Sequence, residues 1–200
     1  MPQSRTINNE LVLVKMGPRG NLNLERSCLY TAWDEPCYGR VKQILISYSA
    51  YSINSIQMVY ELNGEEVLGE RHGGDGDFFE SIRFGTGHYI TSISGHYGYV
   101  NRDDPMTICS LKFSTASYLH GRGPTTASYG PFGRETGTLF RFDTKGIDSL
   151  RGFHGTSSST HLSSIGVYFA LPNVKHLSQS GEQPALRSIA GMTMVALPPP

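Results

Sequence analysis

The stretches SYGPFGRETGTLFRFD, residues 128–143, and RGFHGTSSSTHLSSIGVYFAL, residues 151–171, decide the fold of this chain. Each contains a glycine-rich tetrapeptide, Gly130–Gly133 or Gly152–Gly155, which we expect to form a turn because glycine adopts positive φ without strain. Each also contains an apolar run of period two, formed by Thr138, Phe140 and Phe142 and by Ile165, Val167 and Phe169. This period is typical of half-buried β-strands. The pattern predicts a β-scaffold with loops at its end, which indicates binding rather than chemistry.

Upstream of these stretches, strand and turn signals alternate from Leu11 onward. Further strands are predicted at 41–49, 54–70, 77–85, 88–100 and 107–116. Asn63-Gly64 divides the second of these runs, and this dipeptide predicts a type I′ hairpin turn. We expect a loop at 71–77, a turn at 101–105 and a long connection at 117–130. No segment between Leu11 and Ala170 has the apolar period of a helix, so the predicted fold class is all-β.

The composition indicates one soluble domain with short extensions. The chain has 200 residues, a net charge of +0 and 23 glycines, so neither a nucleic-acid partner nor disorder is expected. The N-terminal sequence lacks the long apolar run of a signal peptide or membrane span, which favours a cytoplasmic location and no membrane partner. We expect a loose segment at 1–10, a folded domain at 11–171 and a mobile proline-rich tail at 172–200, with a short helical or strand-like piece around 185–197.

Residue types that often carry chemistry do not form a recognisable catalytic or metal-binding pattern. The cysteines, Cys28, Cys37 and Cys109, are neither a disulfide framework nor a zinc motif, and Cys109 is expected in the core. The seven histidines lack metal-ligand spacing and mostly adjoin glycine, so we expect them to be solvated in turns. Ser159, Thr160 and His161 are adjacent, which is unsuited to a catalytic triad. We therefore expect no enzymatic activity, no cofactor and no metal.

An ordered set of short motifs adds a resemblance to a known family. The motifs are Gly17–Gly20, Trp33–Glu35, Ile56, Tyr60–Gly64, Ile93–Gly95, Ser110–Phe113, the two glycine tetrapeptides and Ile165–Val167. In this order the chain resembles plant jacalin-related lectins of the mannose-binding branch, over about residues 12–171. Together with Arg71–Gly73 and Tyr89–Thr91, it is most similar to members linked to antiviral resistance.

The resemblance implies an all-β fold, the β-prism I, in which three four-stranded antiparallel sheets surround a pseudo-three-fold axis. It also implies metal-free sugar binding by loops at one end. The family's Gly-x-x-x-Asp motif aligns with Ser159–Ser163, so the acceptor carboxylate is missing, and its Gly-Gly loop aligns with Gly20–Leu24, where one glycine remains. The carbohydrate-binding residues that we expect are Gly20, Asn21, Tyr97, Tyr99, Asn101, Ser159, Thr160, His161 and Ser163.

Loss of the carboxylate leaves two functions open. A charge-assisted hydrogen bond contributes about 1.5–3 kcal/mol against about 1 for a neutral one, so serine would weaken a sugar site about ten- to a hundredfold. The first hypothesis is a mannose- or glucose-type lectin in plant stress or antiviral defence, with a degenerate site. The alternative is a protein-interaction and self-association module with little or no sugar binding. Weak sites gain strength through multivalency, so a homo-oligomer is expected in both cases, and other protein partners are compatible with either.

Overall fold

The computed structural model describes residues 13–21, 29–36, 39–85, 87–102, 104–117, 125–144, 150–170 and 192–195. These ranges contain no helix that is long and apolar enough to cross a bilayer. The strands are β1 (Leu13–Gly20), β2 (Thr31–Pro36), β3 (Arg40–Tyr48), β4 (Ile53–Leu62), β5 (Glu65–Leu68), β6 (His72–Gly73), β7 (Phe78–Arg83), β8 (His88–Gly98), β9 (Thr107–Ser117), β10 (Thr125–Gly133), β11 (Thr138–Asp143), β12 (Leu150–Ser157), β13 (Leu162–Ala170) and β14 (Met192–Val195).

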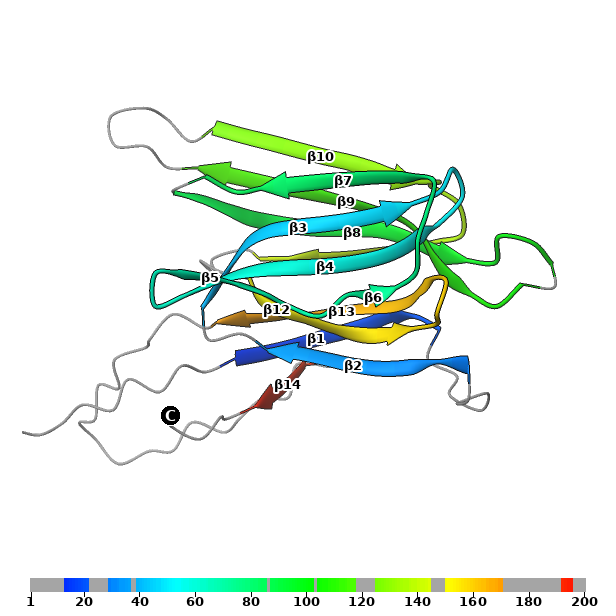
Figure 1. Cartoon of the computed structure of the whole chain (residues 1–200), viewed down its shortest axis with the longest axis horizontal. Helices are drawn as coiled ribbons and strands as arrows, with labels where there is room; N and C mark the ends of the chain where they lie inside the picture. Colours follow the sequence, from blue (N-terminus) through cyan, green and yellow to red (C-terminus); the bar gives the residue numbers. More distant parts are fainter. Residues whose placement is uncertain are drawn as a thin grey trace, which may run out of the picture.

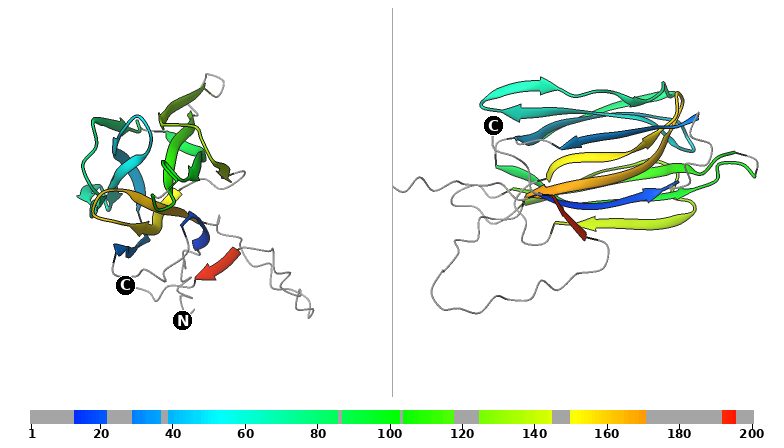
Figure 2. Two further views of the ribbon diagram at one scale, coloured as in Figure 1. Left: turned by 90° about the vertical axis from the view of Figure 1, so that its right-hand side faces the viewer. Right: turned by 90° about the horizontal axis from the view of Figure 1, so that it is seen from below.

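The strands form three antiparallel sheets, which Figure 1 shows from the side and Figure 2 from two other directions. Sheet A has the order β14-β1-β13-β12-β2, and sheet C has the order β10-β9-β8-β11. Sheet B has the order β5-β4-β3-β7, and the short β6 also pairs with β4. The predicted prism of three four-stranded sheets is confirmed, because β14 and β6 only extend two of the four-stranded sheets.

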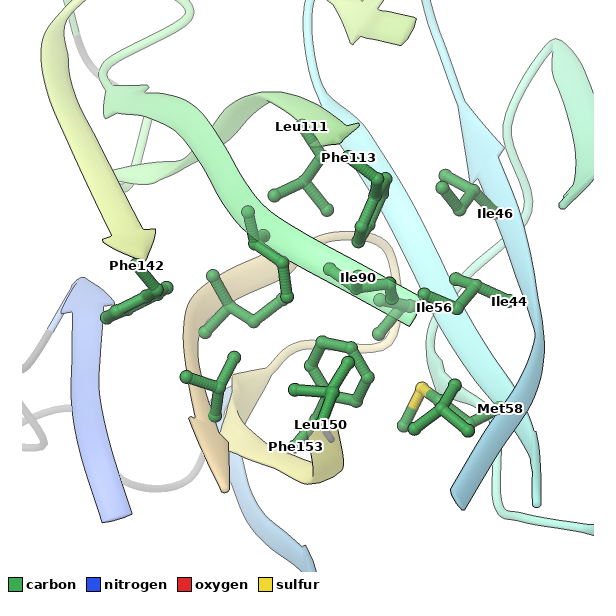
Figure 3. Close-up of a cluster of buried hydrophobic side chains, with 14 of the residues drawn as sticks. Ile44, Ile46, Ile56, Met58, Ile90, Leu111, Phe113, Phe142, Leu150 and Phe153 are labelled. Atoms are coloured by element: carbon green, nitrogen blue, oxygen red, sulfur yellow. The ribbon is translucent and has the colours of Figure 1, made fainter. Parts of the chain in front are cut away.

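One hydrophobic core lies between the three sheets. Of the alternating residues identified in the sequence, Ile165, Val167 and Phe169 of β13 are fully buried in it, and Phe140 and Phe142 of β11 are buried as well. Thr138, expected on the same face as these two phenylalanines, is exposed. Figure 3 shows labelled side chains from all three sheets converging, among them Ile44 of β3 and Phe113 of β9. Burial of each such side chain stabilises the fold by about 1.5–3 kcal/mol. The expected core position of Cys109 is confirmed as well.

The Asn63-Gly64 hairpin is also confirmed. Leu62 of β4 pairs with Glu65 of β5, which leaves a two-residue connection. Asn63 and Gly64 both have positive φ, 53° and 86°, as a type I′ turn requires. A two-residue turn of this type matches the twist of its flanking strands and fixes their register.

The two glycine tetrapeptides are not turns, and this part of the prediction is wrong. Gly152–Gly155 lies inside β12, where its glycines let neighbouring backbones approach closely. A Cβ atom at Gly152 would collide with the carbonyl oxygen of Glu35 in β2, and one at Gly155 with that of Ser164 in β13. Gly130–Gly133 lies inside β10, at a bulge where the register to β9 shifts.

Three other expectations need correction. The connection predicted at 117–130 is too long, because β10 begins at Thr125. The loop predicted at 71–77 contains the two-residue strand β6. His72 and His154, expected in solvent, are buried because their neighbouring glycines belong to strands rather than to exposed turns. Predictions for Cys28, Cys37, residues 1–10 and most of 172–200 lie outside the described residues, although β14 does form a strand within the range expected for a short ordered piece.

Candidate functional site

A pocket of about 390 Å³ lies at one end of the prism, between the β8–β9 and β12–β13 connections. Both connections lie at the right of Figure 1, beyond the same ends of the strands. We call it the end pocket. Its lining residues are Leu29, Tyr30, Val100, Asp104–Thr107, Ser158–His161 and Ser163. The prism therefore places three segments that are distant in the sequence around one hollow.

The β12–β13 wall is a tight turn that satisfies its own backbone. The Ser158 hydroxyl accepts hydrogen bonds from the backbone N–H groups of Thr160 (3.2 Å) and His161 (3.0 Å). The Ser158 N–H donates to the carbonyl oxygen of His161 at 2.9 Å. Serine stabilises such turns because its short side chain reaches the backbone two or three residues ahead. The two amides are thus already paired within the turn.

Sheet B holds this turn in place. The Asn54 side chain of β4 donates through Nδ2 to the carbonyl oxygen of Thr160 at 3.1 Å. Gly74, which follows β6, lies so close to the turn that a Cβ atom there would collide with the carbonyl oxygen of Ser159. The position of the turn is consequently set by a sheet to which its own strands do not belong.

The N-terminal strand reaches the site through its backbone. Gly20 pairs with Ser164, and the N–H of Asn21 donates to the carbonyl oxygen of Ser163 at 2.9 Å. Gly20 and Asn21 therefore lie beside the end pocket but are not among its lining residues. Ser163 lines the pocket but is only 2% exposed. Ser163 therefore offers little polar surface to a ligand.

The three binding residues predicted near the β8–β9 connection, Tyr97, Tyr99 and Asn101, do not come together at the end pocket. Tyr97 packs against Phe140 with ring centroids 6.3 Å apart, and Tyr99 is exposed. Asn101 donates through Nδ2 to Asp104 Oδ2 at 2.6 Å. None of these three lines the end pocket. Of the nine predicted residues, four line it, and they are Ser159, Thr160, His161 and Ser163.

The sequence interpretation missed Asp104, which brings a carboxylate to the end pocket. Its N–H donates to the carbonyl oxygen of Asn101 at 3.2 Å, which closes the turn predicted at 101–105. The sequence signal was this Asn-x-x-Asp-Pro turn, but the sequence does not show which wall the turn faces. Aligned motifs directed attention to position 163 instead.

His161 contributes an uncharged ring to the same space. Its Nδ1 lies 2.8 Å from the Thr160 hydroxyl. Burial lowers the pKa of His161, and the nearby carboxylate of Asp104 opposes this shift only in part, so the ring is neutral at neutral pH. Hydroxyls, a neutral imidazole and a carboxylate, beside the apolar surfaces of Met106 and Tyr30, suit a ligand rich in hydroxyl groups. No group of three or more His, Cys, Asp or Glu in the described ranges is placed to hold a metal ion.

The family match and similar curated proteins point to the same family. Residues 30–168 match the family described as "Jacalin-like lectin domain". The chain is similar to Jacalin-related lectin 3 of Arabidopsis thaliana, with 39% identity over 141 residues, which cover 68% of this chain but 22% of that protein. It is also similar to Protein RESTRICTED TEV MOVEMENT 1 of Arabidopsis thaliana, with 36% identity over 160 residues, 78% of this chain and 86% of that protein.

Solved structures agree with this assignment. A mannose binding jacalin related lectin from Ananas comosus, AcmJRL, matches with a TM-score of 0.63 and 28% identity, over 78% of this chain and 96% of that chain. The artocarpin–mannotriose complex matches with a TM-score of 0.64 and 26% identity, over 82% of this chain and 99% of that chain. The family match at residues 30–168 includes the β8–β9 and β12–β13 connections that line the end pocket.

Proposed function

Because the chain belongs to the jacalin-like lectin domain family, whose members bind carbohydrate without catalysing a reaction, we propose that the end pocket binds a mannose- or glucose-type glycan weakly. The observation that carries this proposal is the convergence of Asp104, Thr160 and His161 on one hollow of about 390 Å³. Its location at the loop end of the prism is where the family resemblance places a sugar. The mannose-type specificity is supported by the titles of AcmJRL and the artocarpin–mannotriose complex.

Two structural features favour low affinity. Position 163 carries a buried serine, and the amides of Thr160 and His161 are already bonded to Ser158. Without a carboxylate at position 163, affinity for a single sugar is expected to be about ten- to a hundredfold lower than with one. Several copies acting together would compensate through multivalency.

The proposal extends to a cytoplasmic role in plant stress or antiviral defence. It is supported by the similarity to Protein RESTRICTED TEV MOVEMENT 1, which extends over most of that protein. Localisation of a fluorescent fusion in plant cells and virus accumulation in a knockout line would test both parts.

Calorimetric titration tests the binding itself. We expect saturable heat with methyl α-mannoside and greater affinity for mannotriose, because a longer ligand contacts more of the β8–β9 wall. Competition on a mannose resin provides a second measurement, in which free sugar should release the bound protein. Absence of heat with both ligands and of retention on the resin would reject sugar binding.

A second candidate function is self-association, and the outer face of sheet B favours it. Phe79 of β7 and Leu68 of β5 are 65% and 60% exposed. Val59 pairs with Leu68 and lies half-buried on the same face. The Arg83–Glu66 ion pair supplies both signs of charge beside this apolar surface, which suits the self-complementary contact that a two-fold axis makes between identical copies.

Light scattering would test this candidate. A dimer or larger oligomer is expected for the wild type, and Phe79→Glu should shift it to the monomer, since charge at the centre of an apolar contact opposes burial. Tyr99→Glu is a matched control on an exposed aromatic residue away from sheet B. A monomeric wild type at high concentration would reject self-association and leave the lectin function unaffected.

A further inference from the structure

The end pocket contains a carboxylate to which neither the family motif nor the comparisons give a role. Of the described residues that line the pocket, Asp104 alone is acidic. It comes from the β8–β9 connection, whereas the family resemblance places the acceptor carboxylate in the β12–β13 connection. The question is whether Asp104 is positioned to accept hydrogen bonds from a sugar.

Asp104 is held by one oxygen, and the other is left for a ligand. Its Oδ2 accepts hydrogen bonds from the Asn101 backbone N–H at 3.1 Å and from Asn101 Nδ2 at 2.6 Å. No hydrogen bond to Oδ1 is formed by the residues that the structure describes. A carboxylate has about four lone-pair sites, so a group held at one oxygen retains acceptor capacity at the other. Its orientation is fixed in advance, which lowers the entropic cost of binding.

Position 163 cannot take this role in the present chain. Ser163 is 2% exposed, and its carbonyl oxygen is engaged by the N–H of Asn21. Its hydroxyl is also neutral, so any hydrogen bond that it accepted would lack charge assistance. Among the described residues that line the end pocket, the carboxylate therefore lies on the β8–β9 wall, at Asp104, rather than on the β12–β13 wall.

The residues around Asp104 leave its carboxylate able to accept hydrogen bonds from neutral donors of a ligand. On the opposite wall, the titratable group is His161. Its ring is neutral at neutral pH, so it does not form an ion pair with the Asp104 carboxylate. Met106 and Tyr30 provide apolar surface in the same pocket, suited to the C–H face of a sugar ring. Sugar hydroxyls are the donors that such a combination recognises.

We propose that Asp104 supplies the acceptor carboxylate for sugar hydroxyls, in place of the aspartate that the family motif has at position 163. The inference rests on the proposed lectin function, and it names the residue that determines affinity and hydroxyl specificity. The sugar is then oriented by the β8–β9 connection, with Thr160 and His161 as neutral partners on the other wall.

The test is calorimetric titration of the full chain and of Asp104→Asn with methyl α-mannoside and its 2-, 3-, 4- and 6-deoxy analogues. Asparagine keeps the shape and can still accept from Asn101, so the turn should persist. Replacing a charged by a neutral acceptor is expected to reduce affinity for the parent sugar about tenfold. At least one deoxy analogue should bind the wild type several-fold more weakly than the parent sugar does, and this discrimination should disappear in Asp104→Asn.

Two controls match the design. Asp143→Asn alters an exposed aspartate at the far end of β11, opposite Ser92, and should leave affinity unchanged. Ser163→Ala is the comparison at the position of the family motif, and it should reduce affinity less than Asp104→Asn does, because Ser163 is 2% exposed and its hydroxyl is neutral. Circular dichroism and urea unfolding verify that each variant is folded.

The outcomes separate the inference from the function on which it rests. If Asp104→Asn binds as the wild type does, or if Ser163→Ala alone abolishes binding, the inference is overturned and the lectin function stands. If Asp104→Asn weakens the parent sugar and every deoxy analogue equally, Asp104 acts only through the turn, which also overturns it. If the wild type binds none of the sugars, both proposals fail.

Discussion

His154 is buried on sheet A and is uncharged for a physical reason. It is 3% exposed, its Nε2 donates to the carbonyl oxygen of Met16 at 3.1 Å, and its ring packs edge-on against Tyr168. Burial, with a further contribution from the positive charge of Lys15, lowers the pKa of His154 to about 4. The histidine of the unfolded chain, with its ordinary pKa near 6.5, therefore binds a proton more readily than the folded one.

This difference predicts that acid destabilises the protein well before its carboxylates titrate. Because the folded pKa is lowered, the stability that neutral His154 contributes is fully present above pH 6.5 and is lost as pH falls toward about 4. Linkage gives a loss of about 2 kcal/mol in the free energy of unfolding between pH 7 and 5. Urea unfolding at the two pH values measures it.

The matched variant is His154→Gln, which can still donate to Met16 but does not titrate. It should be less stable than the wild type at pH 7, yet show a much smaller loss between pH 7 and 5. His161, whose pKa is also lowered, contributes with the same sign, so some pH dependence should persist. Equal losses in wild type and variant would show that His154 is not the titrating group.

Single residues at the site were only partly predictable. The sequence placed Ser159–Ser163 just before the strand at 165–169, and four of these residues line the end pocket. The burial of Ser163 and the role of Asp104 as lining residue depend on how two connections from different sheets face one another. A sequence gives the turn chemistry of each connection but not the direction in which its side chains point across a gap.

At the scale of elements, Glu35 of β2 joins sheet A to sheet B. Its Oε1 accepts from the Glu70 N–H at 2.8 Å and lies 3.0 Å from His72 Nε2, and its Oε2 accepts from the Tyr60 hydroxyl at 3.0 Å. Trp33 stacks on His72 with ring centroids 4.0 Å apart. Burial raises the pKa of Glu35, but the hydrogen bonds from His72, Glu70 and Tyr60 together outweigh it, so the net pKa is lowered.

We therefore expect Glu35→Gln to destabilise the protein by about 2 kcal/mol, because the amide cannot accept all three hydrogen bonds and leaves a partly buried donor unpaired. Glu66→Gln is the matched control, since Glu66 pairs with Arg83 on the exposed face of sheet B. Its cost should be below about 1 kcal/mol. Urea unfolding at pH 7 compares the two variants. A similar cost for both would show that the sheet A–sheet B junction does not depend on the carboxylate.

Strands were more predictable than the features that interrupt them. Alternation located β3, β4, β7, β8 and β9, and Asn63-Gly64 specified its turn, because both signals are local. The prediction that the glycine tetrapeptides form turns was wrong because glycine is equally suited to a tight turn and to a close contact between strands. Gly152 illustrates the second use, since what excludes a side chain there is the backbone of Glu35, more than a hundred residues earlier in the sequence.

At the scale of the whole molecule, the family resemblance carried by the order of the motifs implied three sheets around one core, and the structure confirms it. The main core cluster draws its buried residues from the span between Trp33 and Phe169. The pairing of β14 with the outer edge of β1 follows from no periodic signal, because four residues are too few to show one. The boundary at residue 171 thus stays a prediction about which part of the chain folds by itself.

A variant limited to residues 11–171 is expected to fold and to keep its sugar affinity. The core cluster lies inside this span, and β14 pairs only with Leu13–Met16, at the end of β1 opposite Gly20 and the end pocket. Loss of a four-residue edge strand should lower the free energy of unfolding by about 1–4 kcal/mol, at about 1 kcal/mol or less per residue pair. Circular dichroism, urea unfolding and the mannoside titration measure these quantities.

Full-length Thr193→Pro separates the strand from the rest of the deleted sequence. Proline fixes φ near −65°, away from the extended backbone of an antiparallel strand, so this substitution should weaken the pairing of β14 with β1. If Thr193→Pro and the 11–171 variant lose similar stability, pairing of β14 accounts for the contribution of the C-terminal segment. A variant that fails to fold, or one that folds but loses sugar affinity while Thr193→Pro retains it, would place residues beyond 171 within the functional unit.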